Sequence, residues 1–380
     1  MKTVTCHGQP SWRFSSNKVD ARITRLGGHL APVRFHLPHG TVEPFSIAPW
    51  AEEKISAKTP TLLRALRGDF FCAPFGGNAK SWRGEQHPVH GEPANASWRF
   101  ESVRKNTEET ELHLSLKTKV RAGRIDKFLR LRRGETAVYC RHVLSGMTGP
   151  MSLGHHAMLK FPDRAGSGLI STSPIRYAQV LPVAFEEPAQ GGYQSLKSGA
   201  PFSCLDRVPK MDGTLADLGR YPARRGFDDL VIVTHEAKEN FAWTAVSFPK
   251  EGYVWFALKD PRALRSTVLW ISNGGRHYPP WSSRHVNVMG LEDVTAYFHC
   301  GLSESAQPNP INRRGIATTL TLDRTTPLVV NYIMGVAAIP CDFGRVKNVK
   351  SGKGAITLTS TKGLRVTTPI HTQFLHERPT

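Results

Sequence analysis

An alternation of polar and apolar side chains runs through Glu111-Leu112-His113-Leu114-Ser115-Leu116-Lys117-Thr118, with leucine at every second position. Successive side chains of a strand point to opposite faces, so this pattern predicts a strand that is buried on one face. A similar period of two occurs at 128–132 and at 319–323. Half-buried strands of this kind are typical of antiparallel sheets.

Other segments are rich in strand-forming residues without strict alternation. They lie at 137–144, 230–234, 241–246, 253–258 and 266–271, with further strands expected at 336–339, 355–359 and 364–368. One or two helical turns are expected at 60–66. The 33 Gly and 27 Pro interrupt the chain often, which favours a sandwich or barrel of short strands. We see no linker or repeat. We therefore expect an all-β fold in which residues 1–380 form one large antiparallel domain, with 336–380 as additional C-terminal strands.

The composition, 39% hydrophobic and 21% charged, is ordinary for a globular protein. No apolar run reaches the roughly 18 residues of a membrane span. The first residues are polar and lack the apolar core of a signal peptide, so a cytoplasmic location is expected. The six cysteines are far apart and form no Cys-x-x-Cys pair, which indicates reduced thiols.

The formal net charge is +19, but the Lys and Arg residues are spread over the whole length. Nucleic-acid binding usually requires a basic patch or stripe, and the densest groups here are only 130–133 and 224–225. We therefore expect neither a nucleic-acid nor a membrane partner. An anionic small molecule, such as a phosphorylated or acidic sugar, fits the positive charge of the chain as well as a nucleic acid does.

Four polar clusters could carry chemistry. They comprise Arg67 with His87, His90 and Glu92, then the segments 154–159, 227–230 and 273–281, the last leading to 290–293. Proton transfer near neutral pH requires groups such as a histidine and a carboxylate, and the clusters contain both. Aromatic residues such as Trp281 offer flat surfaces for sugar faces, and arginine offers several donors for hydroxyls or anions.

Other interpretations of the clusters remain open. His87 and His90, together with His155 and His156, could bind zinc, although neighbouring residues of a strand point to opposite faces. Asn273 begins a good turn sequence without any ligand, and Asp228 could close a turn into a strand. We find no Gly-x-Ser-x-Gly elbow, no phosphate-binding loop and no dinucleotide fingerprint.

The order of the motifs resembles the aldose 1-epimerase, or galactose mutarotase-like, superfamily. The segments 67–76 and 90–98 resemble the Arg-Gly-Gly to Pro-x-Phe-Gly stretch and the His-Gly to Trp element of its glucose-6-phosphate 1-epimerase branch. The segment 154–156 is similar to the element with the family's second histidine. Asp228 is at the position of a sugar-binding Asp, and Glu292 is where the catalytic Glu is expected.

The resemblance implies a β-supersandwich and interconversion of the α and β anomers of an aldose without a cofactor. Glu292 would take the proton of the anomeric hydroxyl, His156 would protonate the ring oxygen, and His90 would stabilise the open form. The expected substrate-binding residues are Arg67, Asp228, His155, Asn273 and Trp281. His155 is the alternative to His156 as the acid.

Two other functions remain open at this stage. The departures from the family pattern around His90 and His156 allow a non-catalytic carbohydrate-binding protein on the same scaffold. Related supersandwich folds also serve polysaccharide lyases and hydrolases. The expected partner is a small-molecule sugar, either neutral or anionic, and the protein is expected to be a monomer or homodimer.

Overall fold

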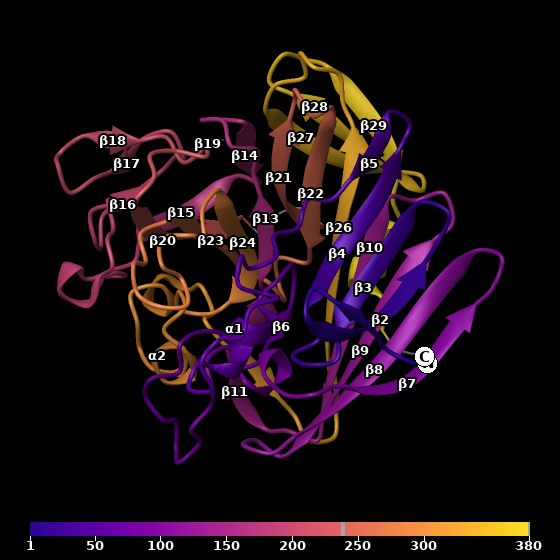
Figure 1. Ribbon diagram of the computed structural model, residues 1–380, viewed down its shortest axis with the longest axis horizontal. Coiled ribbons are helices and arrows are strands. Elements are labelled where there is room, and N and C mark those ends of the chain that lie inside the picture. Colours follow the sequence, from indigo (N-terminus) through magenta and orange to yellow (C-terminus); the bar gives the residue numbers. More distant parts are fainter. Residues whose placement is uncertain (237–239, 379–380) are drawn as a thin grey trace.

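The computed structural model describes residues 1–236 and 240–378 and is built mainly from antiparallel β-strands (Figure 1). Within these residues the largest sheet has nine strands. Its order is β19 (Arg220–Tyr221), β14 (Gly168–Thr172), β21 (Ala242–Phe248), β22 (Tyr253–Lys259), β26 (Leu328–Ala338), β10 (Ala137–Ser145), β9 (Gly123–Arg132), β8 (Glu109–Thr118) and β7 (Arg99–Lys105).

The second large sheet supplies the platform for the candidate site described below. The order of the strands described is β16 (Pro201–Phe202), β15 (Ile175–Val180), β20 (Phe227–His235), β23 (Ser266–Asn273), β24 (Val288–Thr295), β12 (Leu153–His155) and β6 (Phe71–Cys72), and β13 (Ala157–Lys160) also pairs with β24. Strands β20 to β24 of this sheet are buried along nearly their whole length. Burial on both faces explains the unbroken apolar runs at 230–233 in β20 and 268–271 in β23.

Smaller sheets and short helices surround this pair of sheets. The first five strands form one sheet: β1 (Val4–Cys6), β2 (Gln9–Ser15), β3 (Val19–Thr24), β4 (Leu30–Leu37) and β5 (Gly40–Val42). The C-terminal strands form another: β27 (Val346–Gly352), β28 (Ala355–Ser360) and β29 (Arg365–Pro369). Two-stranded pairs are β11 (Gly149–Met151) with β25 (Leu320–Leu322), and β17 (Val208–Pro209) with β18 (Leu215–Ala216). The helices are α1 (Thr61–Ala65), α2 (Leu302–Ala306), η1 (Glu92–Ala94), η2 (Pro188–Gln190), η3 (Asn312–Arg314) and η4 (Thr372–His376).

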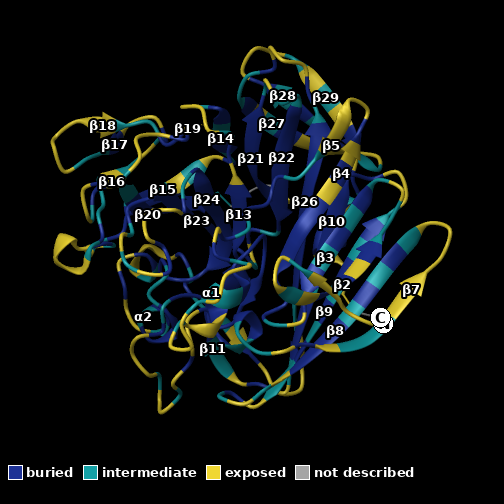
Figure 2. Ribbon diagram, viewed as in Figure 1, coloured by how far each residue is buried: buried dark blue, intermediate teal, exposed yellow. Residues whose placement is uncertain are grey.

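Apolar side chains pack in layers on the faces of the two large sheets. A central cluster joins residues such as Tyr332 of the nine-stranded sheet to Leu291 of the second sheet. The C-terminal strands cover the outer face of the nine-stranded sheet, where Phe256 packs with Ile356. The outer face of the second sheet, around Trp270, is covered by α1 and by long loops. Figure 2 shows the resulting dark, buried interior.

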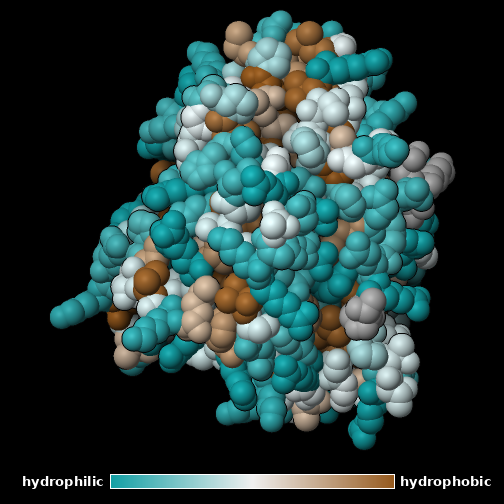
Figure 3. Space-filling view, turned by 90° about the vertical axis from the view of Figure 1, so that its right-hand side faces the viewer, coloured by the Kyte–Doolittle hydropathy of each residue, from teal (hydrophilic) through white to brown (hydrophobic). Residues whose placement is uncertain are grey.

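The structure confirms the all-β prediction. Each segment predicted as a strand overlaps an observed strand, and the helical turn expected at 60–66 is α1. Leucines 112 and 114 of β8 are fully buried, as the alternation requires. None of the helices in the described residues is long and apolar enough to cross a membrane. On the face shown in Figure 3, hydrophilic side chains predominate and the hydrophobic patches are small.

Candidate active site

His156 and Glu292 lie opposite each other on neighbouring strands. His156 lies between β12 and β13, which both pair with β24. Ala157 pairs with Leu291, so the same register places His156 opposite Glu292. Nε2 of His156 is 3.2 Å from Oε1 of Glu292, and both side chains are buried. The register of two strands therefore assembles a histidine–carboxylate pair.

Burial shifts the pKa values of both members of this pair. It lowers the pKa of His156 to about 3, and the Nδ1 atom of this ring has no hydrogen-bond partner. Burial also raises the pKa of Glu292 well above its usual value, although Arg276 opposes that rise. Both shifts penalise the charged form in a poorly solvated environment. Burial thus favours the neutral carboxylic acid and the neutral imidazole over the ion pair.

His90 approaches the pair from a loop. Its ring is perpendicular to that of His156, with the ring centroids 4.8 Å apart. The backbone N–H of Gly76 donates to Nδ1 of His90, which leaves the proton of the neutral ring on Nε2. His90 has a φ of 60°, a conformation that costs energy outside glycine and occurs preferentially at functional sites. The loop thus presents an N–H donor beside the His156–Glu292 pair.

The three residues line one cavity of ≈ 140 Å³ on the outer face of the second sheet. A cavity of about 150 Å³ is large enough for one six-membered ring such as benzene. One wall is aliphatic and comes from α1 and the 89–90 loop, including Leu62 and Leu66. The lining also includes the rings of Phe185, Trp270 and Trp281. The cavity therefore has about the volume of a single six-membered ring, with aromatic, histidine and carboxyl side chains in its lining.

Arg276 also lines the cavity, although the sequence reasoning did not select it as a site residue. Nε of Arg276 donates to Oε1 of Glu186 at 2.5 Å, and Nε is 3.6 Å from Oδ2 of Asp228. Burial lowers the pKa of Arg276, but Asp228 and Glu186 more than offset this, so the pKa is raised. The adjacent glycines at 274 and 275 are the sequence feature that could have indicated a functional loop at Arg276. Glu186, the partner of Arg276, is 90 residues away in the sequence, and no sequence pattern predicts that the two residues pair.

His299 is a second cavity residue outside the predicted set. It follows β24, and burial lowers its pKa to about 4. Its ring is perpendicular to that of Phe185, with centroids 5.1 Å apart. An isolated histidine after a strand carries no distinguishing sequence pattern, so only the structure identifies it.

Two predicted site residues lie away from the cavity. The guanidinium of Arg67 is fully buried and donates to the backbone carbonyls of Cys6, His7 and Ala65. It anchors the turn between β1 and β2 and is not among the residues that line the cavity, which corrects the expectation that Arg67 binds the substrate there. His155 points to the opposite face from His156, as strand parity requires, and its Nδ1 is 2.8 Å from Oδ2 of Asp69. The structure thus places His156, and not His155, at the cavity.

Asp228 and Asn273 support the site without lining it. The Asp228 carboxylate accepts hydrogen bonds from the backbone N–H groups of Asn273 and Gly275 and from the Ser272 hydroxyl. The Asn273 side chain donates to the carbonyl of Ala223 and accepts from the backbone N–H of residue 287. These bonds fix the loop that carries Arg276. The expectation of direct sugar contacts is corrected for both residues, whereas Trp281 does line the cavity.

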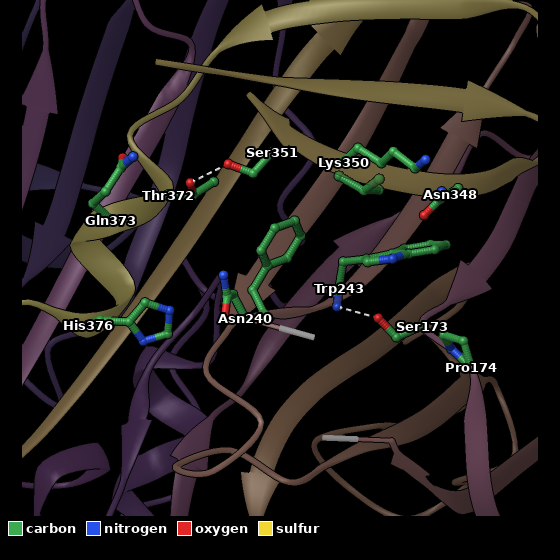
Figure 4. A pocket seen from close by; sticks show the side chains of 12 residues that line it. Ser173, Pro174, Asn240, Trp243, Asn348, Lys350, Ser351, Thr372, Gln373 and His376 are labelled. Atoms are coloured by element: carbon green, nitrogen blue, oxygen red, sulfur yellow. Dashed lines mark hydrogen bonds between the residues drawn. The ribbon is translucent and has the colours of Figure 1, made fainter. Parts of the chain in front are cut away.

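A larger hollow of ≈ 590 Å³ lies between β21 and the C-terminal segment of β27 and η4 (Figure 4). Its described lining combines Trp243 with amide and hydroxyl side chains, and Ser351 bonds to Thr372 there. The lining residues include Lys350 and His376 but no Asp or Glu among those described. This hollow therefore lacks the histidine–carboxylate pair that distinguishes the smaller cavity.

No protein-family model and no curated protein matches the sequence. Comparison with solved structures gives similar folds at low identity. A galactose mutarotase-like protein from Clostridium acetobutylicum has a TM-score of 0.59 at 10% identity, covering 89% of this chain and 98% of that chain. A candidate aldose 1-epimerase from Escherichia coli K12 has a TM-score of 0.58 at 12% identity, covering 87% of this chain and 100% of that chain.

A galactose mutarotase related enzyme from Lactobacillus acidophilus has a TM-score of 0.54 at 12% identity, covering 87% of this chain and 98% of that chain. The fold is galactose mutarotase-like. Because the identities are so low, these comparisons describe the architecture of the chain. Its chemistry rests on the residues of the cavity.

Proposed function

We propose that the protein is a sugar mutarotase, an isomerase that interconverts the α and β anomers of an aldose. The observation that carries this proposal is the buried His156–Glu292 pair, with Nε2 and Oε1 3.2 Å apart, in the lining of a cavity of ≈ 140 Å³. Ring opening requires one group that accepts a proton and a neighbouring group that donates one, and a carboxylate and a histidine can fill these roles.

The proton balance of the pair fits the reaction. In its ion-pair form, the Glu292 carboxylate takes the proton from the anomeric hydroxyl while protonated His156 gives its proton to the ring oxygen. The bond between C1 and the ring oxygen breaks, and the carbonyl forms at C1. Glu292 is then protonated and His156 is neutral, and these are the forms that burial favours.

Rotation about the C1–C2 bond followed by reclosure gives the other anomer. On reclosure, the hydroxyl formed from the ring oxygen gives its proton back to His156 and attacks C1, while Glu292 returns its proton to the carbonyl oxygen. The pair therefore ends as it began. The Nε2–H of His90 donates to the open-chain carbonyl oxygen, where negative charge develops in the transition state. The rings of Trp270 and Trp281 pack against the sugar faces. The chemistry consists of proton transfers between the sugar and the side chains of Glu292 and His156.

Polarimetry of freshly dissolved aldoses tests the proposal. We expect the wild-type protein to accelerate the approach to the equilibrium rotation for at least one sugar in a panel of neutral and phosphorylated aldoses. Glu292→Gln should remove the acceleration. Calorimetric binding of a sugar without acceleration would instead support the carbohydrate-binding alternative. The absence of both binding and acceleration would refute the proposal.

A further inference from the structure

The charge balance inside the cavity differs from that of the whole chain. The sequence carries a formal net charge of +19, yet Arg276 is the single Lys or Arg among the described residues that line the cavity. Glu186 contacts this guanidinium at 2.5 Å, and Asp228 is 3.6 Å away. Both carboxylates are buried. Two buried carboxylates therefore lie beside the one cation of the cavity lining.

The remaining ionisable groups at the cavity add little positive charge. Burial lowers the pKa of His156 to about 3 and that of His299 to about 4, and it also lowers the pKa of His90. These three rings are neutral at physiological pH. The excess of Lys and Arg is therefore located elsewhere on the protein, where solvent and salt screen it.

Glu186 also holds the Arg276 guanidinium in place. Tyr278 donates its hydroxyl to Oε2 of Glu186, opposite the oxygen that accepts from Arg276. The Arg276 guanidinium carbon is 4.6 Å from the Trp281 ring centroid and 5.0 Å from that of Phe185. Aromatic rings thus flank a cation whose charge is already matched, an arrangement that stabilises the guanidinium without a ligand.

We propose that Glu186 is a specificity-determining residue: by neutralising Arg276, it closes the cavity to sugars that bear a phosphate or carboxylate and leaves it open to neutral aldoses. This inference rests on the proposed mutarotase function. An anionic sugar group would have to replace Glu186 at the guanidinium or lie beside uncompensated carboxylates, and like charges at close range in a desolvated site are strongly unfavourable. A hydroxyl carries no such penalty.

Matched substrates and variants test the proposal. The rate of anomer exchange is measured for neutral aldoses and for their 6-phosphate and 6-carboxylate counterparts. We expect wild-type kcat/KM to favour the neutral sugars by about tenfold or more, since tenfold corresponds to one close charge interaction of modest size. Glu186→Gln keeps the shape and a hydrogen-bond acceptor, and it should reduce this preference by about tenfold and create inhibition by inorganic phosphate.

Glu187→Gln is the control, because Glu187 is the exposed neighbour of Glu186 and should leave the preference unchanged. Glu186→Ala provides a second variant if the Gln variant does not fold. A wild-type preference for the phosphorylated sugars, or an unchanged preference in both Glu186 variants, would overturn the inference while leaving the mutarotase function intact. If no aldose is accelerated, the proposed function fails. In that case, phosphorus NMR measures the binding of inorganic phosphate to the wild-type protein and to Glu186→Gln. Tighter binding to the variant supports the role of Glu186, and equal binding contradicts it.

Discussion

Gly290 determines where the Glu292 carboxylate can lie. The two residues are separated by one position on β24, so their side-chain directions share a face of the sheet. A Cβ atom added at Gly290 would lie 2.4 Å from Oε1 of Glu292. The carboxylate thus occupies the space above a glycine, and that position brings it to His156. A side chain at residue 290 would displace the flexible carboxylate more easily than it would displace the strand.

We therefore expect Gly290→Ala to lower kcat/KM by about 10²-fold, as a displacement of about 1 Å at a catalytic group does, with little change in melting temperature. Anomer-exchange kinetics and thermal unfolding measure the two effects. Gly352→Ala is the control, because a Cβ there would meet no atom closer than 3.8 Å and β27 is not part of the cavity. Full activity of Gly290→Ala would show that the carboxylate position is not critical.

At the scale of elements, strand parity sorts the polar residues of β24 and β12 into two environments. Glu292 faces the cavity, whereas its neighbour Asp293 faces the interior between the sheets, where it accepts from Tyr332 and contacts fully buried Lys259. The strands could be predicted from their composition. The choice between His155 and His156 could not, because it depends on the register with β24, which is set by pairing over a separation of more than 130 residues.

The buried pair of Lys259 and Asp293 gives a stability prediction. Asp293→Ala leaves the Lys259 ammonium without its carboxylate, and removal of one partner of a buried ion pair costs about 3–5 kcal/mol. The urea midpoint should fall accordingly. The double variant Lys259→Met with Asp293→Leu should recover most of the loss, because no unpaired charge remains. Equal stability of the single and double variants would contradict this account of the interior.

At the scale of the whole molecule, the all-β architecture follows from alternation, turn residues and strand-forming segments. The charge of the chain was a poorer guide to the site. The net charge of +19 suggested an anionic ligand, but charge at the cavity depends on which loops converge there. Glu186 and Arg276 come from loops that the fold brings together, and Arg67 is turned toward the N-terminal strands. These placements depend on tertiary packing, which local sequence patterns do not contain.

Several buried neutral histidines make the whole fold sensitive to acid. Burial lowers the pKa of His29, His156 and His285 to about 3 and that of His299 to about 4. Below pH 6.5 the unfolded chain binds protons that the folded protein does not. Stability therefore falls as the pH falls from 6.5 toward these values, with a slope of up to about 1.4 kcal/mol per pH unit for each histidine.

Glu292 acts in the opposite direction, because its raised pKa makes the folded state bind its proton more readily. Burial likewise raises the pKa of Glu135, Glu186, Asp228 and Asp229, but it also lowers the pKa of His90, His142 and His235. The histidines with lowered pKa values therefore outnumber the carboxyl groups with raised ones. We expect the melting temperature at pH 5 to lie well below that at pH 7.5. A melting temperature that is constant or rises on acidification would contradict the neutral, buried state of these rings.

The measurement that tests the central claim most directly is two-dimensional exchange NMR of the anomeric protons of an aldose at equilibrium. The spectra compare wild-type protein with Glu292→Gln at equal concentration. The His156–Glu292 pair predicts exchange peaks between the α and β anomers that grow with wild-type protein and stay at the uncatalysed level with Glu292→Gln. Equal exchange with both proteins would show that Glu292 does not move the proton.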